Sequence, residues 1–182
     1  MGPARRAPGV LALAVSDADR LLGIYLNDHR AAAVGTLELA RRSAGANRSN
    51  RYGVFLAELA GELEADLHAL EELMERLQLG RDRLKQLAGW TAEKFGRFKL
   101  NGRWLDYSPL SLVVELEVLS LGVDGKLSLW RGLQKLADQD PRLDADELAG
   151  LAARARSQRQ RLERRRLQAA RAAFREAPGS AS

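Results

Sequence analysis

Two acidic residues lie where the pattern of a helix calls for apolar ones. Residues 52–79 repeat apolar side chains at the spacing of an amphipathic helix. At about 100° per residue, Asp66 falls inside the apolar face and Glu62 at its edge, on neighbouring turns. A buried carboxylate needs a counter-charge or a metal ion, because an isolated buried charge costs too much free energy. Two interpretations stay open: the acids reach water at the edge of the face, or they form an internal polar site.

Other polar residues fall on apolar helix faces elsewhere in the chain. Arg166 lies in the centre of the inner face of the last predicted helix, with Arg159 near its edge. The first predicted helix carries a histidine in the middle of its apolar face, and the third has a glutamate bordering its main face. A lone histidine there is more often a hydrogen-bonded core residue than a ligand. The candidate internal polar cluster therefore has six members: His29, Glu62, Asp66, Glu115, Arg159 and Arg166.

The residue types exclude several kinds of chemistry. The chain has no cysteine, which rules out disulfides, thiolate metal sites and cysteine nucleophiles. Its two histidines are too few for a histidine-rich metal site. We find no nucleophile beside a base, no glycine-rich phosphate loop and no serine elbow. The sequence therefore names no catalytic residue and favours a protein that is not an enzyme.

Four long helices must position these side chains. Hydrophobic residues make up 46% of the 182 residues, aromatic ones 5%, and there are five prolines, which favours an all-α protein. Ser16, Ser108 and Asp144 are the expected N-caps, with Pro109 in the first helical position. Gly122 in the third helix, like Gly125, indicates close helix packing or a local kink. The predicted helices cover residues 17–42, 52–79, 109–137 and 145–175.

The connections between these helices differ in length. The loops at 43–51 and 138–143 are short, so each joins antiparallel neighbours. The connection after Gly80 is long, and residues 83–99 within it predict a short, basic, amphipathic helix. We expect residues 1–15 to be a flexible tail rather than a signal peptide, residues 16–175 to form a single domain and residues 176–182 to be a disordered tail.

This layout resembles a known family. The segments ELEADLHALEELMERL (62–77) and ELEVLSLGVDGKLSLWR (115–131) are similar to those of small, uncharacterised bacterial ferritin-like proteins. The resemblance covers about residues 17–175. It implies a ferritin-like four-helix bundle whose second and third helices are joined by a long crossover.

The resemblance also implies a di-iron site, built from a Glu on each of two helices and a Glu-x-x-His on each of the others. This chain lacks both Glu-x-x-His motifs, since Glu64 and His68 are four residues apart and face outward. No cofactor is therefore favoured. A residual iron or manganese site in iron handling or oxidant defence is the alternative, and its ligands would be His29, Glu62, Asp66 and Glu115.

A guanidinium can replace a metal ion as the counter-charge of buried carboxylates. We therefore expect Arg166, with Arg159, to enter the bundle and pair with Asp66 or Glu62. His29 and Glu115 would complete the network. The function that follows is a non-catalytic structural or interaction protein.

Charge and hydropathy suggest partners. The net charge is +5, and residues 147–176 contain nine arginines against three glutamates. This arginine-rich helix offers a second alternative function, the binding of nucleic acid or another acidic surface. The third helix is apolar almost all round and offers a face for a homodimer. No apolar run has the length of a membrane span, and we expect a cytoplasmic protein.

Overall fold

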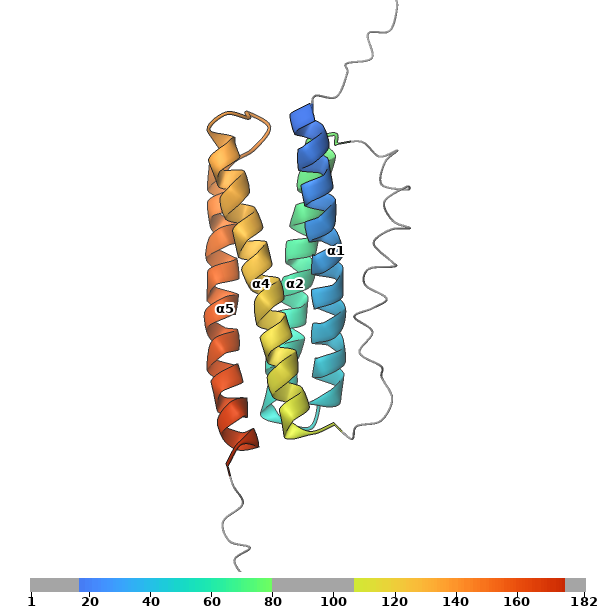
Figure 1. Cartoon of the computed structure of the whole chain (residues 1–182), viewed down its shortest axis with the longest axis vertical. Helices are drawn as coiled ribbons and strands as arrows, with labels where there is room; N and C mark the ends of the chain where they lie inside the picture. The colour runs from blue at the N-terminus through green and yellow to red at the C-terminus, as the bar shows by residue number, and fades with distance from the viewer. Residues whose placement is uncertain (1–16, 80–106, 176–182) are drawn as a thin grey trace, which may run out of the picture.

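The computed structural model describes residues 17–79 and 107–175, and these residues form an all-α bundle without strands (Figure 1). This confirms the predicted fold class. Ser16, Gly80, the tails and the predicted helix at 83–99 lie outside the described residues. The four helices are α1 (Asp17–Ala46), α2 (Arg51–Arg76), α4 (Pro109–Ala137) and α5 (Ala145–Ala173).

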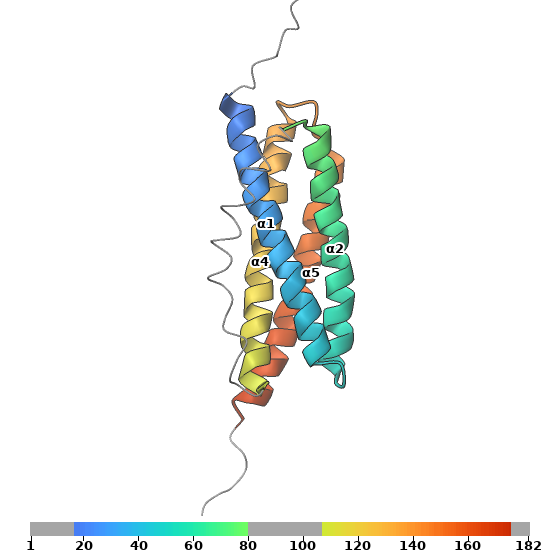
Figure 2. The same ribbon diagram turned by 90° about the vertical axis from the view of Figure 1, so that its right-hand side faces the viewer.

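Helices that pack side by side in the bundle run in opposite directions (Figure 1). Helices α1 and α5 run one way, and α2 and α4 run the other way (Figures 1 and 2). The end of α2 and the start of α4 therefore lie at opposite ends of the bundle. Helix α1 packs against α2 and α4, and α5 packs mainly against α4. Helices α2 and α5 are neighbours whose backbones make the fewest close approaches, so side chains must bridge most of the space between them.

Local sequence signals set most helix ends. Ser108 and Ser111 form the capping box of α4, and Pro109 opens that helix as predicted. Asp144 caps α5 by accepting hydrogen bonds from two backbone N–H groups of the first turn. Glu147, three residues after Asp144, forms an ion pair with Arg76 of α2, with 2.6 Å between Nη2 and Oε2.

The first loop is shorter than the sequence suggests. Helix α1 continues to Ala46, because the expected Gly/Ser loop stays helical for four more residues. Asn50 then caps α2 by accepting from the backbone N–H of Tyr52. Helix α2 ends at Arg76, before the predicted end, because Gln78 adopts a left-handed backbone with a φ of 52°.

Gly122 marks a close contact between two helices. A Cβ atom at this position would lie 2.3 Å from Oγ1 of Thr36, so α1 and α4 meet here closely enough that any larger residue would force Thr36 to shift. Close packing, the first of the two expectations for this glycine, is therefore confirmed. A Cβ atom at Gly125 would meet no described atom within 4 Å.

The apolar core falls into two halves along the bundle axis. One half is centred on the α1–α2 turn and includes Leu56, Leu59, Leu116 and Leu162. The other surrounds the α4–α5 turn and includes the fully buried Trp130. None of the four helices combines the length and the hydropathy that a membrane span requires.

Candidate functional site: a buried polar layer

A layer of polar side chains separates the two halves of the core. It consists of Asp66, Lys126 and Gln158, one residue from each of α2, α4 and α5, and we call it the polar layer. All three are buried, with Asp66 at 2% exposure and Gln158 at 0%. On each helix the residue lies between side chains of one half and side chains of the other.

The three side chains form a closed ring of hydrogen bonds. The Lys126 ammonium donates to Oδ2 of Asp66 and, at 2.7 Å, to Oε1 of Gln158. The Gln158 amide nitrogen donates to the same Asp66 oxygen at 2.9 Å. Each side chain thus contacts the other two, and each has hydrogen-bond partners within the layer.

Arg154 adds a second positive charge to Asp66. Its guanidinium forms an ion pair with Oδ1 of Asp66, although that oxygen accepts no hydrogen bond of good geometry from any described residue. Arg154 therefore contributes mainly through its charge, reaching in from a side chain that is 41% exposed. The Asp66 carboxylate therefore faces two cations. Burial lowers the pKa of Lys126, and the nearby charge of Arg154 adds a smaller decrease, while the negative charge of Asp66 opposes the shift.

Glu62 forms a second bridge between α2 and α5. Its carboxylate pairs with the guanidinium of Arg161, and both side chains are about one-third exposed. The Arg161 Nε–H is buried and has no acceptor among residues 17–79 and 107–175. Together with Asp66–Arg154, this pair spans α2 and α5, the neighbouring helices whose backbones approach least. Long arginine side chains therefore do the bridging that close backbone packing does elsewhere in the bundle.

The arginines expected inside the bundle lie elsewhere. Arg166 donates to Glu163 on its own helix at 2.8 Å and to Glu117 of α4 at 3.3 Å, rather than to Asp66 or Glu62. Arg159 pairs with Asp124 at 2.7 Å. The reason is the rotational phase of α5, which turns Ala155, Gln158, Leu162 and Ala169 inward and leaves both arginines on the flank next to α4. The expected pairing of these two arginines is wrong.

His29 and Glu115 also lie outside the polar layer. His29 is half-buried against the ring of Tyr25, edge to face at 4.5 Å between centroids. Burial lowers its pKa, and the charge of Asp28 opposes that shift. Glu115 accepts from the Tyr107 hydroxyl at 2.9 Å, and it lies about 16 Å along α4 from Lys126 at 1.5 Å per residue. Neither side chain completes the expected network.

The four residues considered as metal ligands are therefore not gathered. His29 meets an aromatic ring, Glu115 a tyrosine, Glu62 an arginine and Asp66 a lysine. Within residues 17–79 and 107–175, no three histidine or acidic side chains come close enough to hold one ion. The polar layer consists of the Asp66 carboxylate, the Gln158 amide and the Lys126 ammonium. The ammonium already donates to the carboxylate oxygen that would otherwise bind a cation.

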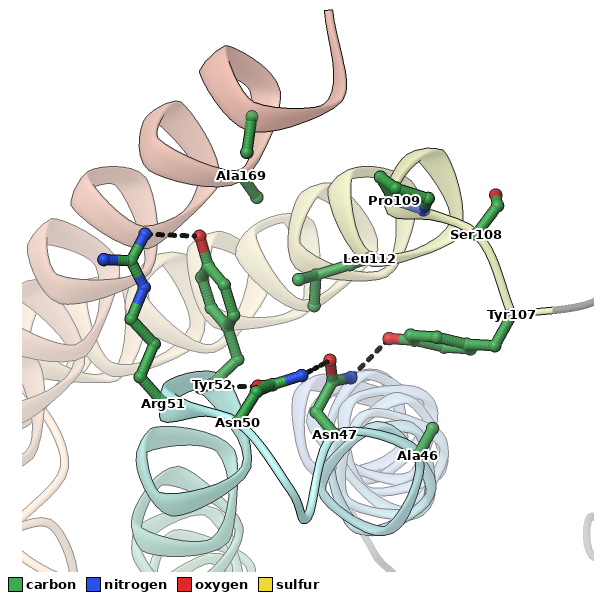
Figure 3. A pocket seen from close by; sticks show the side chains of 11 residues that line it. Ala46, Asn47, Asn50, Arg51, Tyr52, Tyr107, Ser108, Pro109, Leu112 and Ala169 are labelled. Carbon is green, nitrogen blue, oxygen red and sulfur yellow. Dashed lines mark hydrogen bonds between the residues drawn. The ribbon is translucent and has the colours of Figure 1, made fainter.

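A hollow of about 550 Å³ opens at the end of the bundle near the α1–α2 turn (Figure 3). Asn47 donates to the Tyr107 hydroxyl, and Arg51 donates to the Tyr52 hydroxyl at 3.3 Å. Burial raises the pKa of Tyr107 to about 12. The hydrogen bond with Asn47 lowers this pKa, and the hydrogen bond with Glu115 raises it. These polar groups hydrogen-bond to one another. Among the described residues that line the hollow, no nucleophilic side chain lies beside a general base.

Two residues of the polar layer were missed by reasoning from the sequence. Lys126 lies three residues after Val123 and four before Trp130, which is core spacing on α4. Gln158 lies three after Ala155 and four before Leu162, also core spacing on α5. A search for any polar residue at core spacing, rather than for acids, histidines and arginines, would have found both.

Comparisons with protein-family models, with curated proteins and with solved structures find no match for this chain. Functional inference therefore rests on the residues themselves.

Proposed function

We propose that the protein is a non-catalytic scaffold, a ferritin-like bundle whose internal polar site holds its helices together. The observation that supports this is the pairing of Asp66 with cations of the same chain. Lys126 and Arg154 face its two oxygens, and Gln158 donates to one of them. The counter-charge that a metal would supply in a ferritin-like site is supplied here by side chains.

Such a layer suits a structural role. A buried ion pair adds little net stability, because desolvation offsets the attraction between the charges. A polar group at one level of an apolar bundle can instead fix how the helices align, because other alignments leave it unpaired. The polar layer lies between the two core halves and ties α2, α4 and α5 at one level. We propose that it specifies the register of these helices.

A residual metal site has less support. Its four proposed ligands engage four different partners, and they are spread along the bundle. Binding of nucleic acid through α5 also has less support than the charge count suggests. Four arginines of that helix already face carboxylates of the same molecule: Arg154, Arg159, Arg161 and Arg166.

Metal loading tests the proposal. The purified full chain is incubated with Fe²⁺ without oxygen, or with Mn²⁺, and its bound metal and melting temperature are measured after desalting. We expect no stoichiometric metal and no rise in melting temperature. One ion per chain, with a rise that Asp66→Asn abolishes, would overturn the scaffold proposal in favour of the metal site. His68→Gln is the matched control, since His68 is exposed on α2.

A further inference from the structure

The outward face of α4 carries a continuous line of uncharged side chains. Its apolar members are exposed, and Leu121 at 70% is the most exposed of them. All members are separated by three or four residues, and from residue 118 to residue 132 the steps alternate as in a coiled-coil seam. We call this line the outer seam: Leu110, Val114, Val118, Leu121, Gly125, Ser128, Gly132 and Leu136.

Glycines in the outer seam have little explanation within the bundle. A glycine in a helix interior costs about 1 kcal/mol relative to alanine. Gly122 offsets that cost through its contact with Thr36, whereas a Cβ atom at Gly125 would meet no described atom within 4 Å. At Gly132 the nearest described atom would be the Tyr25 hydroxyl at 3.8 Å, an ordinary contact. Small residues on an outer face allow another helix to approach closely from outside.

The two halves of the outer seam are complementary in size. The first half carries the large side chains of Leu110, Val114, Val118 and Leu121. The second half carries Gly125, Ser128 and Gly132, which leave room for large side chains, and it ends at Leu136. An antiparallel second α4 centred near Gly125 would place Val118 against Gly132 and Leu121 against Ser128, while Val114 would lie against Leu136. A parallel arrangement would place large on large and leave gaps between the small halves.

Charge beside the outer seam favours the same orientation. Glu117, Asp124 and Arg131 are seven residues apart and so flank the seam on the side of α5. Asp124 pairs with Arg159, and Glu117 is half-exposed beside Arg166. Arg131 is exposed and makes no ion pair with any described carboxylate. In an antiparallel pair about this centre, the flanks next to α5 meet, and Glu117 of one copy lies beside Arg131 of the second copy. In a parallel two-fold pair each of these flanks would meet the opposite flank of the second copy, and Glu117 and Arg131 would not come together.

We propose that the outer seam of α4 binds a second copy of this chain, antiparallel, about a two-fold axis near Gly125. One self-complementary patch on each copy is what a two-fold dimer requires. The proposal rests on the proposed scaffold function and names its partner. It does not depend on the polar layer, which lies on the inner side of the same helix.

Oligomeric state gives the first test. In sedimentation velocity on the full chain, we expect a dimer that Leu121→Arg converts to a monomer without loss of helical circular dichroism. Val54→Arg is the matched control, because Val54 is 65% exposed on α2, and it should stay dimeric. A wild-type chain that stays monomeric at all accessible concentrations would overturn the proposal. The same result would be obtained if residues 80–106 of the same chain covered the outer seam in place of a second copy.

Cross-linking tests the orientation, since the chain has no cysteine of its own. Gly125→Cys should oxidise to a disulfide-linked dimer, whereas Gly150→Cys, in open space on α5, should not. Val118→Cys alone should fail, because the two copies of residue 118 would lie about 21 Å apart along the helix. Mixing Val118→Cys with Gly132→Cys should restore the cross-link.

The outcomes of these tests are separable. Cross-linking of Val118→Cys alone would overturn the antiparallel arrangement, and absence of any cross-link would overturn the dimer. Neither result would change the metal-loading outcome, so failure of the dimer is distinguishable from failure of the scaffold proposal.

Discussion

The ammonium group of Lys126 in α4 donates a hydrogen bond to Asp66 of α2 at the boundary between the two halves of the core. The contact joins two helices that lie diagonally across the bundle, since α4 packs against α1 and α5. Gln158 of α5 contacts both partners and draws a third helix into the same layer. The ion pair therefore ties together segments that are not direct neighbours.

Removing one side of this pair should be costly. Lys126→Met leaves the Asp66 carboxylate buried with only Gln158 and Arg154, and breaking a buried pair typically costs about 3–5 kcal/mol. We expect a loss of about 3 kcal/mol in the free energy of unfolding, the low end, because Arg154 remains. Urea denaturation measures it. Arg41→Met breaks the exposed pair with Glu64 and should cost under about 1 kcal/mol, so equal losses in the two variants would contradict this account.

Replacing both partners should cost less than the two single changes together. Asp66→Leu removes the carboxylate, and Lys126→Met then no longer leaves a charge unpaired, so an apolar pair of similar size can be nearly neutral. We expect a favourable coupling of about 1–3 kcal/mol in a double-mutant cycle. Additive losses within error would show that the two side chains act independently.

His29 should make stability depend on pH. Burial holds its pKa below the ordinary value of 6.5 in the folded protein, so the unfolded chain takes up the proton first as pH falls. The stabilisation is present above pH 6.5 and is lost as pH falls through the folded pKa. Melting temperatures between about pH 5 and pH 8 should therefore fall less on acidification for His29→Gln than for wild type.

His68 provides the control for that profile, because it is exposed on α2 and lies away from the core. His68→Gln should follow the wild-type curve. A profile that both variants flatten equally would assign the effect to net charge rather than to the burial of His29.

The fold could be predicted because its signals are local. Ser108 with Pro109 and Asp144 mark helix starts through their own hydrogen bonds, so no distant contact is needed to read them. The apolar spacing of α2 likewise placed Asp66 inside the core, where the structure has it. The end of α2 was harder to predict, because the left-handed backbone of Gln78 has no strong sequence signature.

The partner of Asp66 could not be predicted in the same way. On α5, a small error in rotational phase exchanges the inward position of Gln158 for that of Arg159 or Arg166. Length matters too: Arg154 and Arg161 lie beside the inward face of α5 rather than on it, yet their long side chains carry the charge to carboxylates of α2. A helix face that is predicted from Cα positions alone does not account for the length of the arginine side chains.

Gly53 should tolerate no side chain. A Cβ atom there would lie 2.3 Å from the carbonyl oxygen of Asn47 and 2.9 Å from Cα of Arg48, and backbone atoms of the α1–α2 turn have little room to move. Gly53→Ala should therefore destabilise the protein by about 1–3 kcal/mol, the usual cost of overpacking, despite the better helix propensity of alanine.

Gly61 on the same helix is the matched control for Gly53. It is exposed, with no described atom near its Cβ position, so Gly61→Ala should stabilise the protein by up to about 1 kcal/mol. Urea denaturation of both variants measures the difference. If Gly53→Ala were as stable as Gly61→Ala, the turn would have to give way at Asn47, and the close approach of α1 and α2 would not constrain the fold.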